Sequence, residues 1–279
     1  HNLVMETSKT AAKINESENL ANIRYAAPDE IFQNSKPVLA GVDLESTYCY
    51  LLSAEDHRDE TTWGVHLLEL KERGLQPIYT VADGGRGLRA GQAAAWPDIP
   101  CHGDVFHAEY ELGKLVNFIE NRAATAFSKL EKLESKMFKA KNRKQGQKLS
   151  KSLALARQNE NKISLLADEI RTLSEWMRDD ILSFAGPDLE SRRELFDFIV
   201  AEIEKRESQF AYKIRPVRVS LHNQRDILLG FVTELERQFA SIAEQLDVPI
   251  YLVQSTSELQ GLNQEDAPYW IQRTELQRK

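Results

Sequence analysis

The sequence is poor in cysteine, in long apolar runs and in net positive charge. Its 279 residues include only two cysteines, Cys49 and Cys101, too few for the disulfide framework of a small secreted protein. The cysteine content therefore favours a reducing, cytoplasmic compartment. No apolar run approaches the roughly 18 residues that a membrane-spanning helix needs, so no membrane partner is expected.

The net charge of −7 means that any binding of nucleic acid must depend on where the basic residues cluster. The composition is otherwise ordinary, with 42% hydrophobic and 28% charged residues, and excludes a wholly disordered chain.

The order of apolar segments predicts an α/β domain followed by a large helical block. Residues 1–35 are polar and are interpreted as an N-terminal arm or linker. Residues 36–115 have the order β-β-α-β-α-β: a hairpin at 37–43 and 47–53, helices at 60–73 and 88–96, and strands at 77–82 and 99–106.

From residue 116 to residue 247 the pattern is helical. Two long segments meet near residues 141–146 to form a helical hairpin, and two further helices, 188–209 and 217–245, are divided near Pro216. Residues 248–279 are a return segment, which begins with a short apolar stretch at 248–253 that suits a strand or an extended link.

Asp43 and Asp83 each end an apolar strand. If the two strands are neighbours, the carboxylates repel one another unless a cation lies between them, and such a pair suits a divalent metal ion with open positions for water and phosphate. The alternative is that each acid only caps a turn or the following helix.

Asp104 and His107 follow the last expected strand, where they could support the acidic site or cap the next helix. Cys101, His102 and His107 lie close together in the sequence, but they lack a fourth ligand at zinc-site spacing.

Four glycines punctuate residues 84–91, and residues 85–90 loosely fit the G-x-G-x-x-A pattern of dinucleotide-binding loops. The acid at the end of the preceding strand would face the pyrophosphate, and few βαβ units follow. The glycines are therefore interpreted as a sharp turn that leaves the Asp83 carboxylate exposed.

Basic residues concentrate at the tip of the helical hairpin. Residues 129–151 contain nine Lys or Arg and two Glu. This tip is predicted to contact DNA phosphates rather than bases, since only one of the nine is arginine; the alternative is an ordinary solvated helix face. The candidate DNA-binding residues are Lys139, Lys141, Arg143, Lys144 and Lys148.

Five short segments occur in an order that resembles bacterial insertion-sequence transposases of the DDE type. They are DEIF at 29–32, PVLAGVD at 37–43, Trp63 with HL at 66–67, VADGGRGL at 81–88 and DVFH at 104–107. Looser similarity continues to LHNQRD at 221–226 and to YW at 269–270.

The resemblance implies an RNase H-like core with a mixed β-sheet, with the first acid on the first strand and the second after the fourth. Asp43 and Asp83 are assigned to these positions. It further implies a two-metal Mg²⁺ (or Mn²⁺) site that cleaves and joins DNA. The implied partners are transposon ends, target DNA and further copies of the chain assembled on DNA, in a bacterial, nucleoid-associated setting.

Such transposases carry a third acid, usually glutamate, on a helix after a helical insertion. The nearest candidate is Glu258, but Asn263 does not follow it at the usual spacing. Because the helical pattern at 269–279 ends without a stop signal, the third acid is expected beyond Lys279. Two alternatives stay open: an RNase H-like nuclease or resolvase that does not join strands, and a non-catalytic DNA-binding or scaffolding remnant.

Overall fold

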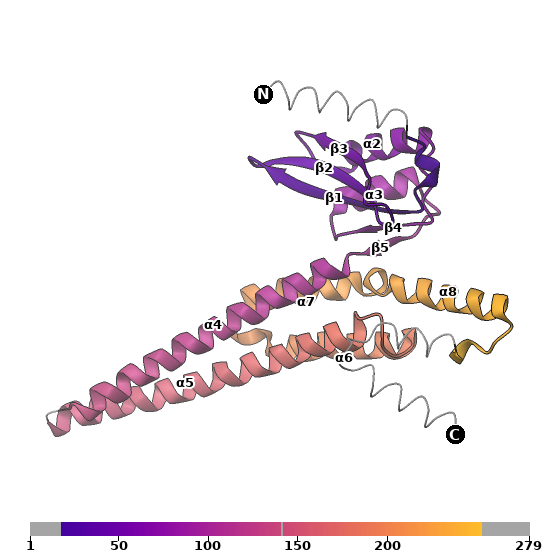
Figure 1. The fold of residues 1–279 in the computed structure, drawn as a ribbon. Coiled ribbons are helices and arrows are strands. Elements are labelled where there is room, and N and C mark those ends of the chain that lie inside the picture. Colours follow the sequence, from indigo (N-terminus) through magenta and orange to yellow (C-terminus); the bar gives the residue numbers. More distant parts are fainter. Residues whose placement is uncertain (1–17, 141, 253–279) are drawn as a thin grey trace. The chain divides into compact units, whose positions relative to one another are not determined.

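The computed structural model describes residues 18–140 and 142–252 (Figure 1). The chain divides into two compact units, with the boundary between Asp104 and Val105. The first is an α/β unit and the second is entirely helical among the described residues.

The first unit contains a five-stranded sheet with the order β3-β2-β1-β4-β5. Strands β1 (Tyr25–Gln33), β2 (Lys36–Asp43) and β3 (Cys49–Ala54) form an antiparallel meander. Strands β4 (Tyr79–Ala82) and β5 (Cys101–Gly103) extend the sheet parallel to β1. The sheet is therefore mixed, and β1 is its central strand.

Two helices cover one face of this sheet. Helix α2 (Glu60–Glu72) begins at Asp59, whose carboxylate accepts the Thr62 N–H, and the chain leaves it through Gly74 at φ 100°. Helix α3 (Arg86–Ala95) packs beside α2. Apolar residues of both helices, of four strands and of the segments next to them form one core: Leu20, Ile23, Ala26, Leu39, Tyr50, Leu51, Trp63, Leu67, Leu70, Leu75, Ala82, Leu88, Ala95 and Trp96.

The strand β1 corrects the expectation that residues 1–35 are an arm. Residues 25–33 lie at the centre of the sheet and pair with β2 over eight positions. Pro28 is tolerated there because the ladder with β4 ends at Ala26, so that beyond this point only one edge of β1 is paired. The expected hairpin at 37–43 and 47–53 is confirmed as β2 and β3, and the expected helices at 60–73 and 88–96 as α2 and α3.

The second unit begins with a long antiparallel hairpin of two helices (Figure 1). Helices α4 (Val105–Phe138) and α5 (Arg143–Trp176) have 34 residues each, about 50 Å at 1.5 Å per residue. Asn142 caps α5 by accepting the Gln145 N–H. The hairpin is as expected, but it starts at residue 105 rather than within a block that begins at 116.

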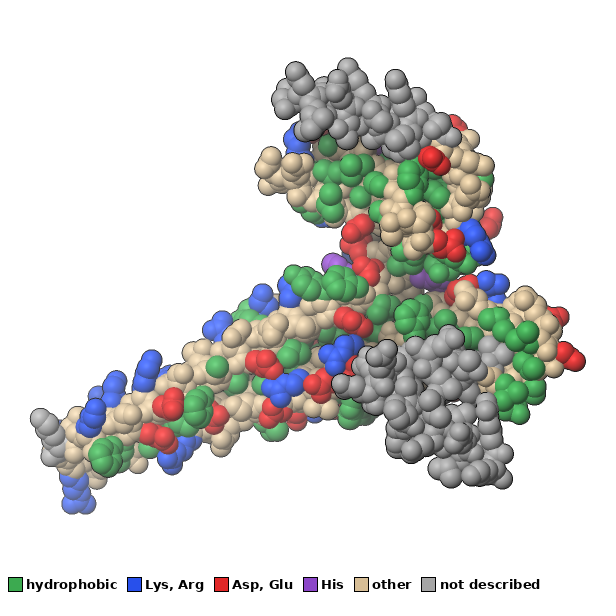
Figure 2. Space-filling view, in the orientation of Figure 1, with side chains coloured by type: hydrophobic (Ala, Val, Ile, Leu, Met, Phe, Trp, Pro, Cys, Tyr) green, Lys and Arg blue, Asp and Glu red, His purple; other side chains and the backbone are tan. Residues whose placement is uncertain are grey.

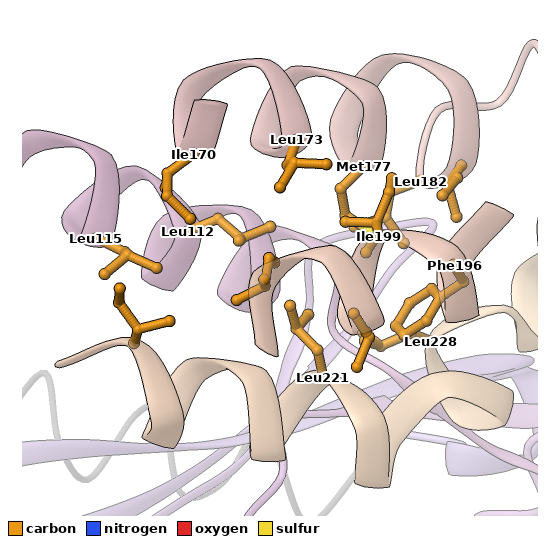
Figure 3. Packing of buried hydrophobic residues seen from close by; sticks show 14 of the residues in the cluster. Leu112, Leu115, Ile170, Leu173, Met177, Leu182, Phe196, Ile199, Leu221 and Leu228 are labelled. Atoms are coloured by element: carbon orange, nitrogen blue, oxygen red, sulfur yellow. The ribbon is translucent and has the colours of Figure 1, made fainter. Parts of the chain in front are cut away.

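Three further helices close the second unit. A π-helical turn (Met177–Ile181) follows α5, and then come α6 (Leu189–Arg206), a short 3₁₀ turn (Glu207–Gln209), α7 (Ala211–Leu228) and α8 (Gly230–Leu246). Figure 3 shows leucine, isoleucine, methionine and phenylalanine side chains of α4 to α7 meeting in one core.

Two helix boundaries differ from expectation. Pro216 lies inside α7 instead of dividing two helices. It removes the hydrogen bond to the carbonyl one turn earlier, a cost that the burial of Ile214 and Leu221 on the same helix offsets. Residues 250–252, expected to be strand or extended, are helical.

Arg192 anchors the segment between the π-helical turn and α6. It is only 2% exposed, and its guanidinium donates to the carbonyls of Ile181, Ser183, Phe184 and Pro187. Burial lowers its pKa, and the four carbonyl acceptors take the place of water around the cation. Across the described ranges, no helix combines the length and the apolar character that crossing a membrane requires.

Candidate acidic site at the ends of β1, β4 and β5

The sheet register brings three aspartates to one level. Ala26 of β1 pairs with Thr80 of β4, and Thr80 pairs with Cys101 of β5. Three residues further along each of these parallel segments stand Asp29, Asp83 and Asp104. The Asp104 N–H donates to the Ala82 carbonyl at 2.9 Å. The hydrogen bonding between β4 and β5 therefore continues up to Asp83 and Asp104.

The same alternation places the three carboxylates on the sheet face away from α2 and α3. Ala26 and Ala82 are buried in the core beneath the helices, and neighbouring residues along a strand point to the opposite face. On that second face the rings of Tyr25 and Tyr79 are 4.7 Å apart, and those of Tyr79 and His102 are 5.0 Å apart. Asp29 lies further along the face that carries this aromatic row.

Asp29 is partly buried and lies near other negatively charged side chains. Partial burial raises the pKa of its carboxyl, the Glu30 N–H that donates to it at 2.7 Å lowers it, and the charges of Asp83 and Asp104 raise it. The balance is a raised pKa. Ionised carboxylates that repel one another in this way attract a cation.

Asp83 is held by its own turn. Its Oδ1 accepts the Gly85 N–H at 2.8 Å, and a Cβ atom on Gly85 would stand 2.8 Å from the same oxygen. Glycine is therefore needed at this position for the carboxylate to keep its orientation.

Arg89 of α3 fixes the strand ends that carry two of the acids. Its guanidinium donates to the carbonyls of Ala82 and Asp83 at the end of β4, and to those of Cys101 and His102 in β5, at 2.7–3.2 Å. Arg89 thus ties together the backbone on which Asp83 and Asp104 stand. It is a positioning residue that the sequence interpretation missed, because its partners become neighbours only in the folded sheet.

Close packing accounts for the remaining glycines of the cluster. A Cβ on Gly87 would lie 2.2 Å from the Arg58 carbonyl, and one on Gly91 would lie 2.6 Å from the Cβ of Trp63. These glycines let α3 approach the start of α2. Helix packing therefore explains these glycines without a bound dinucleotide.

Glu30 points to the opposite face from Asp29 and has a structural role. Its carboxylate accepts from Arg58 Nη1 at 2.7 Å and from Trp63 Nε1 at 2.9 Å, and its side chain is 9% exposed. The hydrogen bond and charge of Glu30, and further the charge of Asp83, raise the pKa of Arg58. Glu30 therefore attaches β1 to α2.

The expectation that Asp43 and Asp83 lie on neighbouring strands is wrong. β1 lies between β2 and β4, and Asp43 is level with Ala26 rather than with Asp29. Burial raises the pKa of Asp43, but hydrogen bonds from Ser46 and from the Glu45 N–H outweigh it and lower the pKa below its usual value. Asp43 has the turn-capping role that was the alternative interpretation.

Asp104 joins the acidic row, whereas His107 belongs to the helical unit. There it lines a cavity of about 260 Å³ between α4 and α7 with Glu111, Ser220 and Gln224. Among the residues that the structure describes, no three His, Cys, Asp or Glu side chains are gathered closely enough to hold a metal ion by themselves. Cys101 and His102 are engaged by Arg89 and Tyr79.

Two expected groups of residues remain to be placed. Glu258, and Lys141 of the hairpin tip, lie outside the described residues, whereas Lys139, Arg143, Lys144 and Lys148 are exposed at the tip of the α4–α5 hairpin. No protein-family profile and no curated protein sequence matches the chain.

Proposed function

We propose that this chain carries an RNase H-like core of a DDE-type transposase, and that Asp29 and Asp83 are the first two acids of its metal site. The observation that carries the proposal is the row of carboxylates that the register brings to one level, on β1 and directly after β4 and β5. The resemblance implies one acid on the first strand and one after the fourth. With β1 as the first strand, these acids are Asp29 and Asp83, and Asp43 falls on the second strand.

The donor set suits Mg²⁺ or Mn²⁺. Carboxylate oxygens are the ligands that these hard cations prefer. The pKa of Asp29 is raised first by its partial burial and further by the charges of Asp83 and Asp104, which places these carboxylates near one another. Asp104 stands beside Asp83 as a further oxygen donor. A carboxylate from outside the described residues, Glu258 or one beyond Lys279, would complete the set.

Bound divalent ions would supply activation of a nucleophilic oxygen and stabilisation of the leaving oxygen in phosphodiester attack. The chain's own residues would position the cations and the substrate. Asp29 and Asp83 would hold the cations, and Gly85 and Arg89 keep Asp83 in place. The aromatic row further along the same face would offer apolar contact to a sugar or base.

The test is cleavage and joining of DNA. The chain of residues 1–279 and a chain extended past Lys279, which would supply the third acid, are each incubated with pre-cleaved duplex ends and a target plasmid in Mg²⁺ or Mn²⁺. Hydrolysis and joined products are separated on denaturing gels. The proposal expects joined products that disappear in Asp29→Asn and Asp83→Asn and persist in Asp43→Asn.

Two other outcomes would contradict the proposal. Hydrolysis without joining would indicate an RNase H-like nuclease. DNA binding without either product, in a chain extended past Lys279 as well, would indicate a non-catalytic DNA-binding or scaffolding protein.

A further inference from the structure

The two flanks of helix α4 carry different charges. One flank contains Arg122, Lys129, Lys132 and Lys136, and Lys139 follows directly after the helix ends; the uncharged polar residues between them are Asn121, Thr125, Ser128 and Ser135. At 100° per residue the eight helical positions fall within one sector of α4, and all nine residues are exposed. We call them the α4 stripe.

From residue 120 to the end of α4 the acidic side chains lie outside this sector; nearer the start of the helix Glu111 is in line with Lys129, and it pairs with Lys114 at 2.7 Å. Glu120 pairs with Arg171 at 2.7 Å and Glu134 pairs with Arg157 at 2.8 Å, so these acids are engaged with α5. Within the described part of the chain, no basic residue of the α4 stripe has an ion-pair partner. In Figure 2 blue side chains follow the upper edge of the long hairpin, and most red ones lie below that edge.

We infer that the α4 stripe binds the phosphodiester backbone of duplex DNA. Residues 121 to 139 extend about 27 Å, which matches about eight base pairs of B-DNA at 3.4 Å each. Four of the five basic residues are lysines, which act as point charges on phosphate and give little bidentate reading of bases. Asn121 and Ser128 add hydrogen-bond donors for phosphate oxygens, whereas the Thr125 hydroxyl donates to the Asn121 carbonyl at 2.8 Å. With Lys129 and Lys132 these three residues line a shallow surface depression.

A membrane surface fits the α4 stripe less well. A helix that lies on a membrane must bury an apolar face in it, and the apolar face of α4 packs against α5. The stripe itself has no apolar anchor. The inference deepens the proposed function, on which it rests for the choice of DNA, by naming the surface that holds DNA.

Four of the five basic residues of the α4 stripe, Lys129, Lys132, Lys136 and Lys139, fall within the 129–151 tip that the sequence suggested. The α4 side and the α5 side of that tip can be compared at equal charge. One variant carries Lys129→Gln, Lys132→Gln and Lys136→Gln in the α4 stripe. The matched control carries Arg143→Gln, Lys144→Gln and Lys148→Gln at the start of α5. Both remove three positive charges from exposed positions of the same hairpin.

Binding of a fluorescent random-sequence duplex is measured by anisotropy between 50 and 200 mM KCl without divalent ions. Each lost phosphate contact lowers the slope of log K against log salt by about 0.9, so the stripe variant should lose about 2.7 and bind about 10²-fold or more weakly at 0.1 M salt. The tip control should keep most of the slope. Circular dichroism and thermal melting confirm that both variants are folded.

Several results would overturn the inference. These are a larger loss in the tip control, equal losses in the two variants, or no binding of the duplex by the unmodified protein. Binding to phosphatidylserine vesicles that competes with DNA and depends on the stripe would assign the surface to membranes instead. Because the assay contains no divalent ion, its failure leaves metal-dependent cleavage by Asp29 and Asp83 untouched.

Discussion

Removing one charge from the acidic row should stabilise the first unit, because Asp29 lies among like charges. The β1–β4 pairing ends at Ala26 and Thr80, so we use the strand spacing of about 4.8 Å as a lower limit for the separation of Asp29 from Asp83, and twice that for Asp104. Coulomb's law at the dielectric constant of water then gives about 0.9 and about 0.4 kcal/mol of repulsion. Asp29→Asn should therefore raise the free energy of unfolding by about 1 kcal/mol at pH 7 and low salt.

The pH dependence of this gain follows from the raised pKa of Asp29. An acid whose pKa is higher in the folded state loses stability as it ionises, so its charge destabilises the native protein only above its unfolded pKa of about 3.9. The gain from Asp29→Asn should be absent below about pH 4, grow as the pH rises, and be complete above the raised pKa. Screening by 1 M NaCl should shrink it.

Asp43→Asn is the matched control, because the pKa of Asp43 is lowered. Its charge stabilises the native protein above its unfolded pKa, and this stability is lost as the pH falls through the folded pKa. Asp43→Asn should therefore lower the free energy of unfolding by about 1 kcal/mol at pH 7 and leave it unchanged at low pH. The assay is urea unfolding followed by tryptophan fluorescence, since Trp63 and Trp96 lie in the core of the first unit.

An Asp29→Asn variant that is neutral or destabilising at pH 7 would refute the reasoning. So would a stabilisation that persists unchanged to pH 3, because it could not come from charge repulsion.

Three further substitutions test the packing around the site and in the helical unit. Gly91→Ala should cost about 1–3 kcal/mol in urea unfolding, since its Cβ would overlap α2, whereas Gly113→Ala, with nothing within 4 Å, should gain about 0.5–1 kcal/mol. Arg192→Met should lower the free energy of unfolding by about 3 kcal/mol or more, because it leaves four carbonyls without a donor. A loss below about 1 kcal/mol would mean that water takes the place of the guanidinium. Arg89→Met should weaken Mn²⁺ binding at least tenfold with α-helical circular dichroism unchanged, and Arg89→Lys should recover part of the affinity. Equal affinity in the unmodified protein and both variants would show that Arg89 does not position the site.

The sequence predicted local elements well and long-range pairing poorly. The β2–β3 hairpin, α2 and the α4–α5 hairpin follow from patterns within 10–35 residues, where periodicity and a stop such as Gly74 are sufficient. By contrast, β1 contains Pro28, Asp29 and Glu30, which are poor strand formers, although it pairs with the neighbouring β2 over eight positions. Its place at the centre of the sheet depends on pairing with β4, more than 50 residues away.

The error in the candidate site follows from the missing strand. With residues 25–33 taken as an arm, Asp43 occupied the first strand and appeared to face Asp83. The strand order and register decide which acids lie side by side. When β1 is left out, β2 and β4 become apparent neighbours, and Asp43 is paired with Asp83 in place of Asp29. The available signal was DEIF at 29–32, where Asp29 and Glu30 alternate between the two faces of a segment flanked by apolar residues.

The central claim is that Asp29, and not Asp43, shares a divalent cation with Asp83. Its most direct test is the electron paramagnetic resonance signal of free Mn²⁺ during titration of the protein and of its Asp29→Asn, Asp83→Asn and Asp43→Asn variants. The account predicts that the unmodified protein and Asp43→Asn bind Mn²⁺ alike, whereas Asp29→Asn and Asp83→Asn each lose at least tenfold in affinity. Loss of binding in Asp43→Asn with binding intact in Asp29→Asn would contradict it.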